Sequence, residues 1–261
     1  MPRRRTRRSA TVVVAAAVVA AAALTGGGVA VWRFGLSDAS EPASVDEAVG
    51  RFRGVAGVED SRIPTGVYEY ATNGFEFVSA LGGRRHRYPA RSTITVTTTG
   101  CGVALRWEVL AARTNELALC TAGDELRLSS WSERHEFFGR ADRTDWRCAE
   151  AAWLPAERRP GATSAVRCRS ADAALEGTTT VLGAETVAVG PRRVRALRLR
   201  VDARESGGSR GRLVQEHWLA ADTGLPLRVV YRVRTANPSP IGDVTFEERY
   251  ELELVSLDPR R

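Results

Sequence analysis

The chain has 261 residues, with 38 basic residues that are all arginine and 31 acidic residues. Because it has no lysine, it cannot contain a Walker phosphate loop, a Schiff-base lysine or an SxxK acylation pair. The first 33 residues hold six arginines and no acid, so they supply +6 of the net charge of +7. The remainder is almost neutral, and we therefore expect no nucleic-acid partner.

An uncharged segment at residues 10–32 follows an arginine-rich tail at residues 1–9. At about 1.5 Å per residue, a helix of this length reaches roughly 34 Å, enough to cross the core of a bilayer. The arginines of the tail predict a single-pass protein of the cell membrane with a cytoplasmic N-terminus and its C-terminal domain outside. The alternative is a cleaved signal peptide, because Ala21–Ala23 would suit a signal peptidase.

Residues 33–64 have the polar composition of a tether that contains one short helix. Ser44 and Glu47 have the spacing of a capping box, which predicts a helix over residues 44–53. Apolar residues recur at helical spacing within it, so the helix is amphipathic and we expect it to cap the folded domain. These residues are Val45, Ala48, Val49 and Phe52.

From residue 65 to residue 258 the pattern changes to apolar and polar residues in alternation, which predicts an exported domain rich in antiparallel strands. Turn residues divide the domain into about eight to eleven strands of ordinary length. One predicted turn lies at Thr72–Gly74 and another at Gly207–Gly211. The clearest alternating series are Val103, Leu105, Trp107 and Val109, then Leu197, Leu199 and Val201, and finally Leu227, Val229, Tyr231 and Val233.

Four cysteines lie in the exported part, where an oxidising compartment allows disulfides to persist. Of the three possible pairings we favour Cys101 with Cys120 and Cys148 with Cys168, because each closes a short loop. A zinc site is disfavoured because no CxxC spacing occurs. Residues 140–169 show no sustained periodicity, so we interpret them as an excursion that the second disulfide pins.

No motif in the chain predicts catalytic, cofactor-binding or metal-binding residues. His86, His135 and His217 lack the spacing of a ligand set, and His86 stands among arginines and is expected at the surface. Residues Gly207–Gly211 match the GxSxG pattern, but that motif requires a following helix, whereas a strand is predicted here. We therefore expect neither a cofactor nor enzymatic activity.

Glu248 is the candidate polar anchor of a cavity. It falls on the same face of the last predicted strand as Phe246, Tyr250 and Leu252. A buried carboxylate needs a partner, for which an arginine is the best choice, or carries a raised pKa. A bulge or a shallow rim that exposes Glu248 is the alternative.

Two segments carry a resemblance to a known family. The sequence WLAADTGLPLR at Trp218–Arg228, with TFEERYELELVSL at Thr245–Leu257, resembles the outer-membrane lipoprotein carrier superfamily. The chain is also similar to uncharacterised actinobacterial exported membrane proteins. The carrier resemblance implies an open or half-closed antiparallel barrel whose concave apolar face can hold acyl chains. It transfers no binding residue.

Three functions are compatible with these observations. The first is a membrane-tethered domain that binds a lipid or another amphiphile. The second is a structural or protein-interaction module of the cell envelope, whose core its own side chains fill. The third is an unrecognised hydrolase. The volume and lining of any cavity inside the sheet would separate the first from the second.

Overall fold

The computed structural model describes residues 41–55, 61–137, 140–239 and 242–261. The predicted membrane helix at residues 10–32 and the arginine-rich tail lie outside these ranges. Within them, no helix has both the length and the apolar character needed to cross a membrane. The strands belong to the compact unit of residues 39–137 and 141–261.

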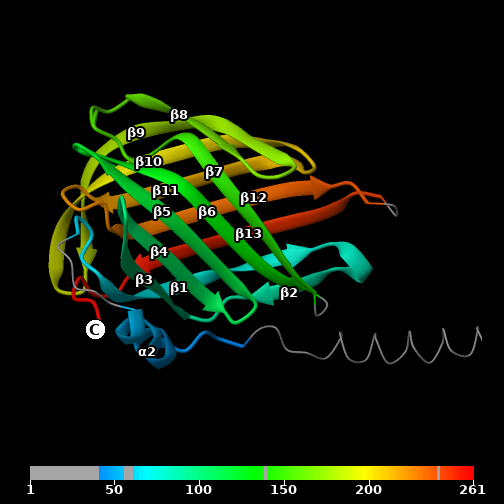
Figure 1. The fold of residues 1–261 in the computed structure, drawn as a ribbon, viewed down its shortest axis with the longest axis horizontal. Coiled ribbons are helices and arrows are strands. Elements are labelled where there is room, and N and C mark those ends of the chain that lie inside the picture. The colour runs from blue at the N-terminus through cyan, green and yellow to red at the C-terminus, as the bar shows by residue number, and fades with distance from the viewer. Residues whose placement is uncertain (1–40, 56–60, 138–139, 240–241) are drawn as a thin grey trace, which may run out of the picture. The chain divides into compact units, whose positions relative to one another are not determined.

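The described chain folds into one antiparallel sheet of thirteen strands with helix α2 (Val45–Val55) (Figure 1). The strands are β1 (Gly66–Val78), β2 (Arg84–Arg87), β3 (Arg91–Thr99), β4 (Gly102–Leu110), β5 (Arg113–Ala122), β6 (Glu125–Phe137), β7 (Arg140–Leu154), β8 (Thr163–Arg169), β9 (Ala173–Val189), β10 (Arg192–Gly207), β11 (Arg210–Ala220), β12 (Pro226–Asn237) and β13 (Val244–Leu254). Each strand from β4 to β12 pairs with the strands before and after it in the chain, and β3 pairs with β4 and β1. A short 3-10 turn, η1 (Ala80–Gly82), connects β1 to β2.

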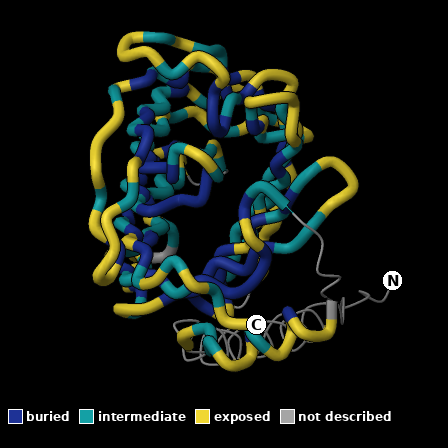
Figure 2. The backbone as a smooth tube through the Cα atoms, turned by 90° about the vertical axis from the view of Figure 1, so that its left-hand side faces the viewer, coloured by how far each residue is buried: buried dark blue, intermediate teal, exposed yellow. Residues whose placement is uncertain are grey.

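The sheet closes into a barrel of twelve strands because β13 also pairs with β1, and Figure 2 shows the strands as a ring. The prediction of a mainly β antiparallel meander is confirmed, but the expected open or half-closed form is wrong. Closure depends on the long strand β1, whose N-terminal half pairs with β3 while residues 70–78 pair with β13.

Gly74 lies inside β1, so the predicted turn at Thr72–Gly74 is also wrong. A Cβ atom at this position would lie 2.4 Å from the backbone oxygen of Arg249 and 2.7 Å from the Cα of Tyr250. The glycine is therefore needed for the close approach of β1 and β13 that closes the barrel.

Residues 140–169 form regular barrel strands, β7 and β8, rather than an excursion. A bulge between Cys148 and Glu150 shifts the register of β7 against β8, so the inward positions change parity within one strand. This shift is why the sequence showed no sustained alternation. Both predicted disulfides, Cys101–Cys120 and Cys148–Cys168, are confirmed. Cys148 and Cys168 are paired residues of β7 and β8, whereas Cys101 lies in the turn before β4 and joins Cys120 of β5.

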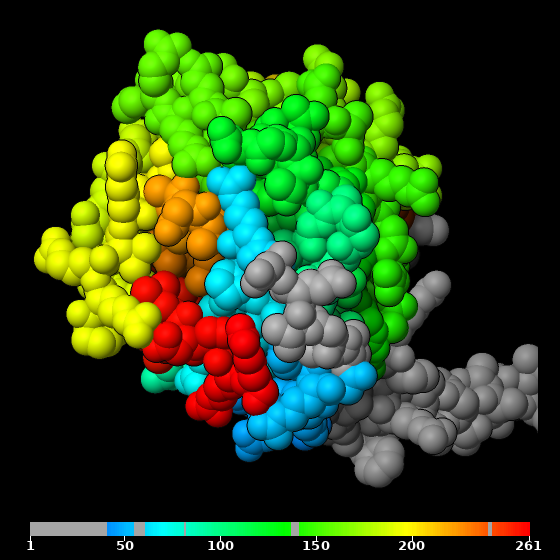
Figure 3. All heavy atoms as spheres, turned by 60° about the vertical axis from the view of Figure 1, so that its left-hand side comes forward, coloured from blue at the N-terminus to red at the C-terminus, as the bar shows by residue number. Residues whose placement is uncertain are grey.

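Helix α2 packs on the outer face of β1 and β3, where Ala48 and Phe52 contact Val67. It begins after Ser44, whose hydroxyl oxygen accepts a 3.4 Å hydrogen bond from the backbone N–H of Glu47. The C-terminal segment ties down the same region, since Arg260 and Val67 form a β-bridge, and Figure 3 shows this red segment beside the blue helix and the cyan start of β1.

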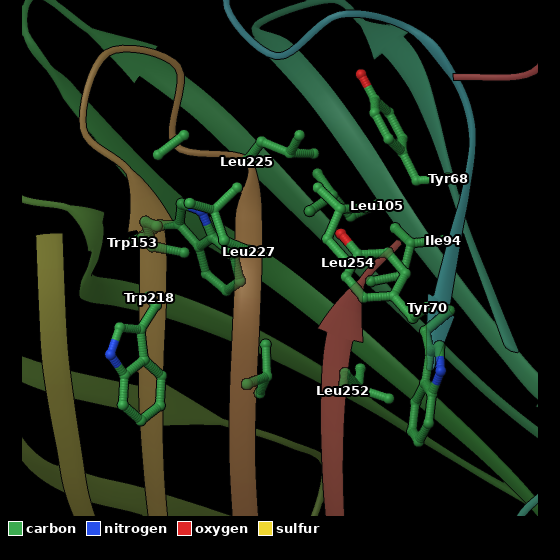
Figure 4. Packing of buried hydrophobic residues seen from close by; sticks show 14 of the residues in the cluster. Tyr68, Tyr70, Ile94, Leu105, Trp153, Trp218, Leu225, Leu227, Leu252 and Leu254 are labelled. Carbon is green, nitrogen blue, oxygen red and sulfur yellow. The ribbon is translucent and has the colours of Figure 1, made fainter. Parts of the chain in front are cut away.

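At one end of the barrel, which we call the closed end, buried side chains pack against the turns. The closed end carries the turns at residues 123–124 and 221–225. Trp153 Nε1 donates a 2.9 Å hydrogen bond to the backbone oxygen of Gly224, and Figure 4 shows Leu225 and Leu227 on the same side of the core as this tryptophan. Arg62 donates 3.1 and 3.0 Å hydrogen bonds to the backbone oxygens of both turns, and Arg158 donates to Ala221 at 2.6 Å.

Candidate functional site

The barrel is hollow between the closed end and the opposite end, which we call the open end and which carries the turns at residues 170–172 and 208–209. An inner chamber of about 120 Å³ lies nearer the closed end, and an outer chamber of about 340 Å³ reaches the open end. The two chambers adjoin, because they share lining residues from strands β6, β9, β11 and β12. The shared residues are Trp131, Glu133, Leu175, Leu213 and Tyr231.

The lining follows from the alternation in the sequence, since every second residue of a barrel strand points inward. In β12 the inward residues Val229 and Tyr231 line the inner chamber, and Val233 and Thr235 line the outer one. Most of the inner wall is aliphatic or aromatic. Its members include Leu105, Trp107, Leu117, Trp153, Leu199 and Leu252.

Five polar side chains interrupt the apolar wall of the inner chamber, and three of them have a buried atom without a partner in the described structure. His217 Nδ1, Thr179 Oγ1 and Asn115 Oδ1 are buried and have no hydrogen-bond partner within the described parts of the chain. The residues His217 and Thr179 are only 4% and 2% exposed. Burial lowers the pKa of His217 to about 3, so its imidazole is neutral and can donate or accept one hydrogen bond.

A buried ion pair lies beside the chambers. Arg113 binds both carboxylate oxygens of Glu248, with Nε to Oε1 at 3.2 Å and Nη2 to Oε2 at 3.1 Å. The hydroxyl of Tyr88 also donates to Glu248 Oε1. Arg113 and Glu248 are fully buried, so each neutralises a charge that would otherwise be costly.

The position of Glu248 thus matches the inward face expected from the sequence, and its partner is an arginine. Its carboxylate holds Arg113 in place, whereas the carboxylate that lines both chambers is that of Glu133. Arg113 Nη2 lies 3.9 Å from Glu133 Oε1, so the ion pair is continuous with the chamber wall.

A second buried carboxylate, Glu76, joins two histidines to this network. His86 Nδ1 lies 2.9 Å from its Oε1, and His135 Nδ1 lies 2.9 Å from its Oε2. Burial opposes ionisation of Glu76, but hydrogen bonds from His135 and His86 and the charges of His135 and Arg113 lower its pKa to about 2. His86 is 3% exposed, so its expected place at the surface is wrong, because pairing of β2 with β1 sets it opposite Glu76.

His135 lines the outer chamber and contacts two carboxylates of this group, those of Glu76 and Glu133. Burial and the charge of Arg113 disfavour its protonation, but hydrogen bonds to Glu133 and Glu76 outweigh them and raise its pKa. Glu133 shows the opposite effect. Although burial opposes its ionisation, the hydrogen bond with His135 and the charge of Arg113 lower its pKa.

The outer chamber has an excess of negative charge. Glu133, Asp172 and Glu205 line it with His135, and no arginine occurs among its described lining residues. Burial, together with the charges of Glu133 and Asp172, raises the pKa of Glu205 to about 7. The stacked rings of Trp131 and Trp146, 4.9 Å apart, form an aromatic part of the wall.

Ser209 of the GxSxG match lies in the hairpin between β10 and β11, and its hydroxyl donates to Glu205. His217 lines the inner chamber and Ser209 the outer one. No cluster of histidine, cysteine and acidic residues suited to a metal ion occurs in the described ranges.

The sequence pointed to Glu248 but not to Arg113, Glu76 or Glu133. One signal was present, because Trp131, Glu133 and His135 alternate along β6 and therefore share the inward face. The partners of that face come from β1, β5 and β13, which only the closure of the barrel brings together.

Comparison with known proteins identifies no family. No family model matches the sequence, and no curated protein matches it. Among solved structures, a hypothetical lipoprotein, YmcC from Escherichia coli K12, is similar to 78% of this chain and to 94% of its own, with 12% identity and a TM-score of 0.31.

Proposed function

We propose that the barrel binds a lipid or another amphiphile in its two chambers. The observation that carries the proposal is an apolar inner chamber with unpartnered polar atoms, which adjoins a larger chamber with charged side chains in its wall at the open end. Such a lining presents one environment to an apolar group and another to a polar head.

The size of the chambers limits the ligand. An engineered apolar cavity of about 150 Å³ binds benzene in another protein, so the inner chamber, at about 120 Å³, suits a ring or a short alkyl chain. The outer chamber, at about 340 Å³, falls in the range of about 300–1,000 Å³ typical of small-molecule sites. The occupant is therefore a compact amphiphile, or the end of a larger one.

The N-terminal segment places this binding near a membrane in our proposal. Residues 10–32 have the length and apolar character of an anchor, and a tethered barrel acts within reach of the bilayer. Sensing or presenting an amphiphile fits such an anchor better than shuttling it between membranes. The proposal includes binding only and no reaction.

A filled structural or protein-interaction module is the second candidate, and the packing of buried side chains at the closed end favours it. In that case the chambers are packing defects without an occupant. A reproducible protein partner after cross-linking in cells, together with no amphiphile binding, is its expected signature.

The test uses the full-length protein in lipid nanodiscs and octan-1-ol as the probe, by calorimetric titration against empty nanodiscs. We expect saturable binding to the protein. Leu199→Trp fills the inner chamber and should abolish binding, whereas Leu182→Trp makes the same change at an exposed site of β9 and should not. Absence of binding by octan-1-ol and its charged analogues contradicts the proposal.

A further inference from the structure

We infer that the site selects amphiphiles with a cationic head and rejects those with an anionic head. This inference rests on the proposed function and adds the charge of the ligand to it. The head lies in the outer chamber among Glu133, Asp172 and Glu205, and the apolar part lies in the inner chamber.

Two buried carboxylates of the network, those of Glu248 and Glu76, already have close partners. Arg113 pairs with Glu248 at 3.1 Å, and His135 hydrogen-bonds Glu76 at 2.9 Å, so each of the two deepest carboxylates has its own partner. Glu133 lies 3.9 Å from Arg113 and 4.0 Å from His135, and these two neighbours lower its pKa and favour its ionised form. It therefore keeps negative charge toward the chamber.

The carboxylates nearer the open end have no cationic partner in the described structure. Asp172 receives a 3.3 Å hydrogen bond from the Ser170 hydroxyl, and Glu205 receives one from Ser209. Burial is the main cause of the raised pKa of Glu205, and repulsion by the charges of Glu133 and Asp172 adds to it. A cation relieves this repulsion, and an anion increases it.

Aromatic rings complete a site for a cation. Trp131 and Trp146 stack at 4.9 Å, and Tyr231 and Phe246 line the same chamber. Ring faces attract ammonium groups, including alkylated ones that carboxylates alone bind weakly.

Independent observations mark these chambers as a built site rather than an acidic surface. His217 and Thr179 line the inner chamber, Trp146 lines the outer one, and each is at least nine-tenths buried. Each also has a polar atom without a hydrogen-bond partner in the described chain: Nδ1, Oγ1 and Nε1 respectively. Burying three such atoms without a partner is costly, so these chambers differ from an ordinary packed core.

The experiment compares three probes that share one chain: octylamine, octan-1-ol and octanoate. Each is titrated at pH 8 into the full-length protein in nanodiscs of zwitterionic lipid, with empty nanodiscs as the reference. Octylamine should bind at least tenfold more tightly than octan-1-ol, and octanoate should show no binding. Octanoate binding equal to or tighter than octylamine overturns the inference, while the proposed function stands if any of the three binds saturably.

A single substitution tests the source of the selectivity. Glu205→Gln should weaken octylamine binding about three- to tenfold and leave octan-1-ol binding unchanged. Glu176→Gln, on the exposed face of the paired strand β9, is the matched control and should change neither. An equal loss for octylamine and octan-1-ol in the Glu205 variant would show that the charge of the head does not matter.

Discussion

The two ends of the barrel use the same strand alternation for different purposes. At the closed end, the inward residues are aliphatic and aromatic, and arginines from outside hold the turns by hydrogen bonds to backbone oxygens. Toward the open end, the inward residues include five carboxylates, an arginine and two histidines. The closed end thus gains its stability from apolar burial, whereas the other end is held by charge pairs and leaves a hollow.

Removing Arg113 should have the largest effect on stability. In Arg113→Leu, the buried carboxylate of Glu248 and its neighbours lose their cation, which should cost about 3–5 kcal/mol of the free energy of unfolding. Urea denaturation followed by tryptophan fluorescence measures it. The double variant Arg113→Leu with Glu248→Leu should recover part of that loss, and a single variant as stable as the wild type would contradict the role given to the network.

Truncation at the closed end should cost slightly less. Leu126 is 1% exposed and lies against the turn at Gly224, so Leu126→Ala leaves a cavity and should cost about 2–5 kcal/mol. The cost should be independent of pH between 5 and 8, because no titrating group is involved. The same truncation at the exposed Leu182 should change stability by less than about 0.5 kcal/mol.

Acid should weaken the charged region selectively through Glu76. Its pKa is about 2 in the folded protein against an ordinary value of 4.5, so its contribution is fully present above pH 4.5 and is lost as pH falls toward 2. The stability difference between the wild type and Glu76→Gln should shrink over this range, by about 3 kcal/mol at most. Denaturation midpoints at pH 5 and pH 3 provide the measurement. An unchanged difference would show that the charge of Glu76 does not stabilise the folded protein.

The smallest expected effect is a gain in stability on removal of one buried hydroxyl. Thr179→Val removes a buried hydroxyl that has no partner and keeps the shape of the side chain, so stability should rise by about 1 kcal/mol or less. Thr178→Val, at the adjacent position of β9 that points away from the inner chamber, is the control. If Thr179→Val destabilises the protein, the hydroxyl of Thr179 has a hydrogen-bond partner, and it no longer supports a binding site in the inner chamber.

Alternation along the strands was sufficient to predict a mainly β antiparallel meander, and cysteine spacing was sufficient to predict both disulfides. Prediction from local patterns failed at two places in the chain. Gly74 carries a turn signal but serves a close approach of strands, and the bulge at Cys148 hid the regular strands β7 and β8. Both are effects of a neighbouring strand, which a local pattern does not contain.

In a strand without a bulge, such as β13, the sequence by itself determined which residues face inward, because the side-chain period of a strand is a property of the backbone, and on that basis Glu248 was expected on the buried face. Only the tertiary structure decided that β1 meets β13, because this pairing joins residues about 180 positions apart in the chain. Closure brought Glu76 of β1, Arg113 of β5, Glu133 of β6 and Glu248 of β13 to one place and enclosed the chambers. The charge balance of the candidate site is therefore a result of closure, since charges interact through space and not along the chain.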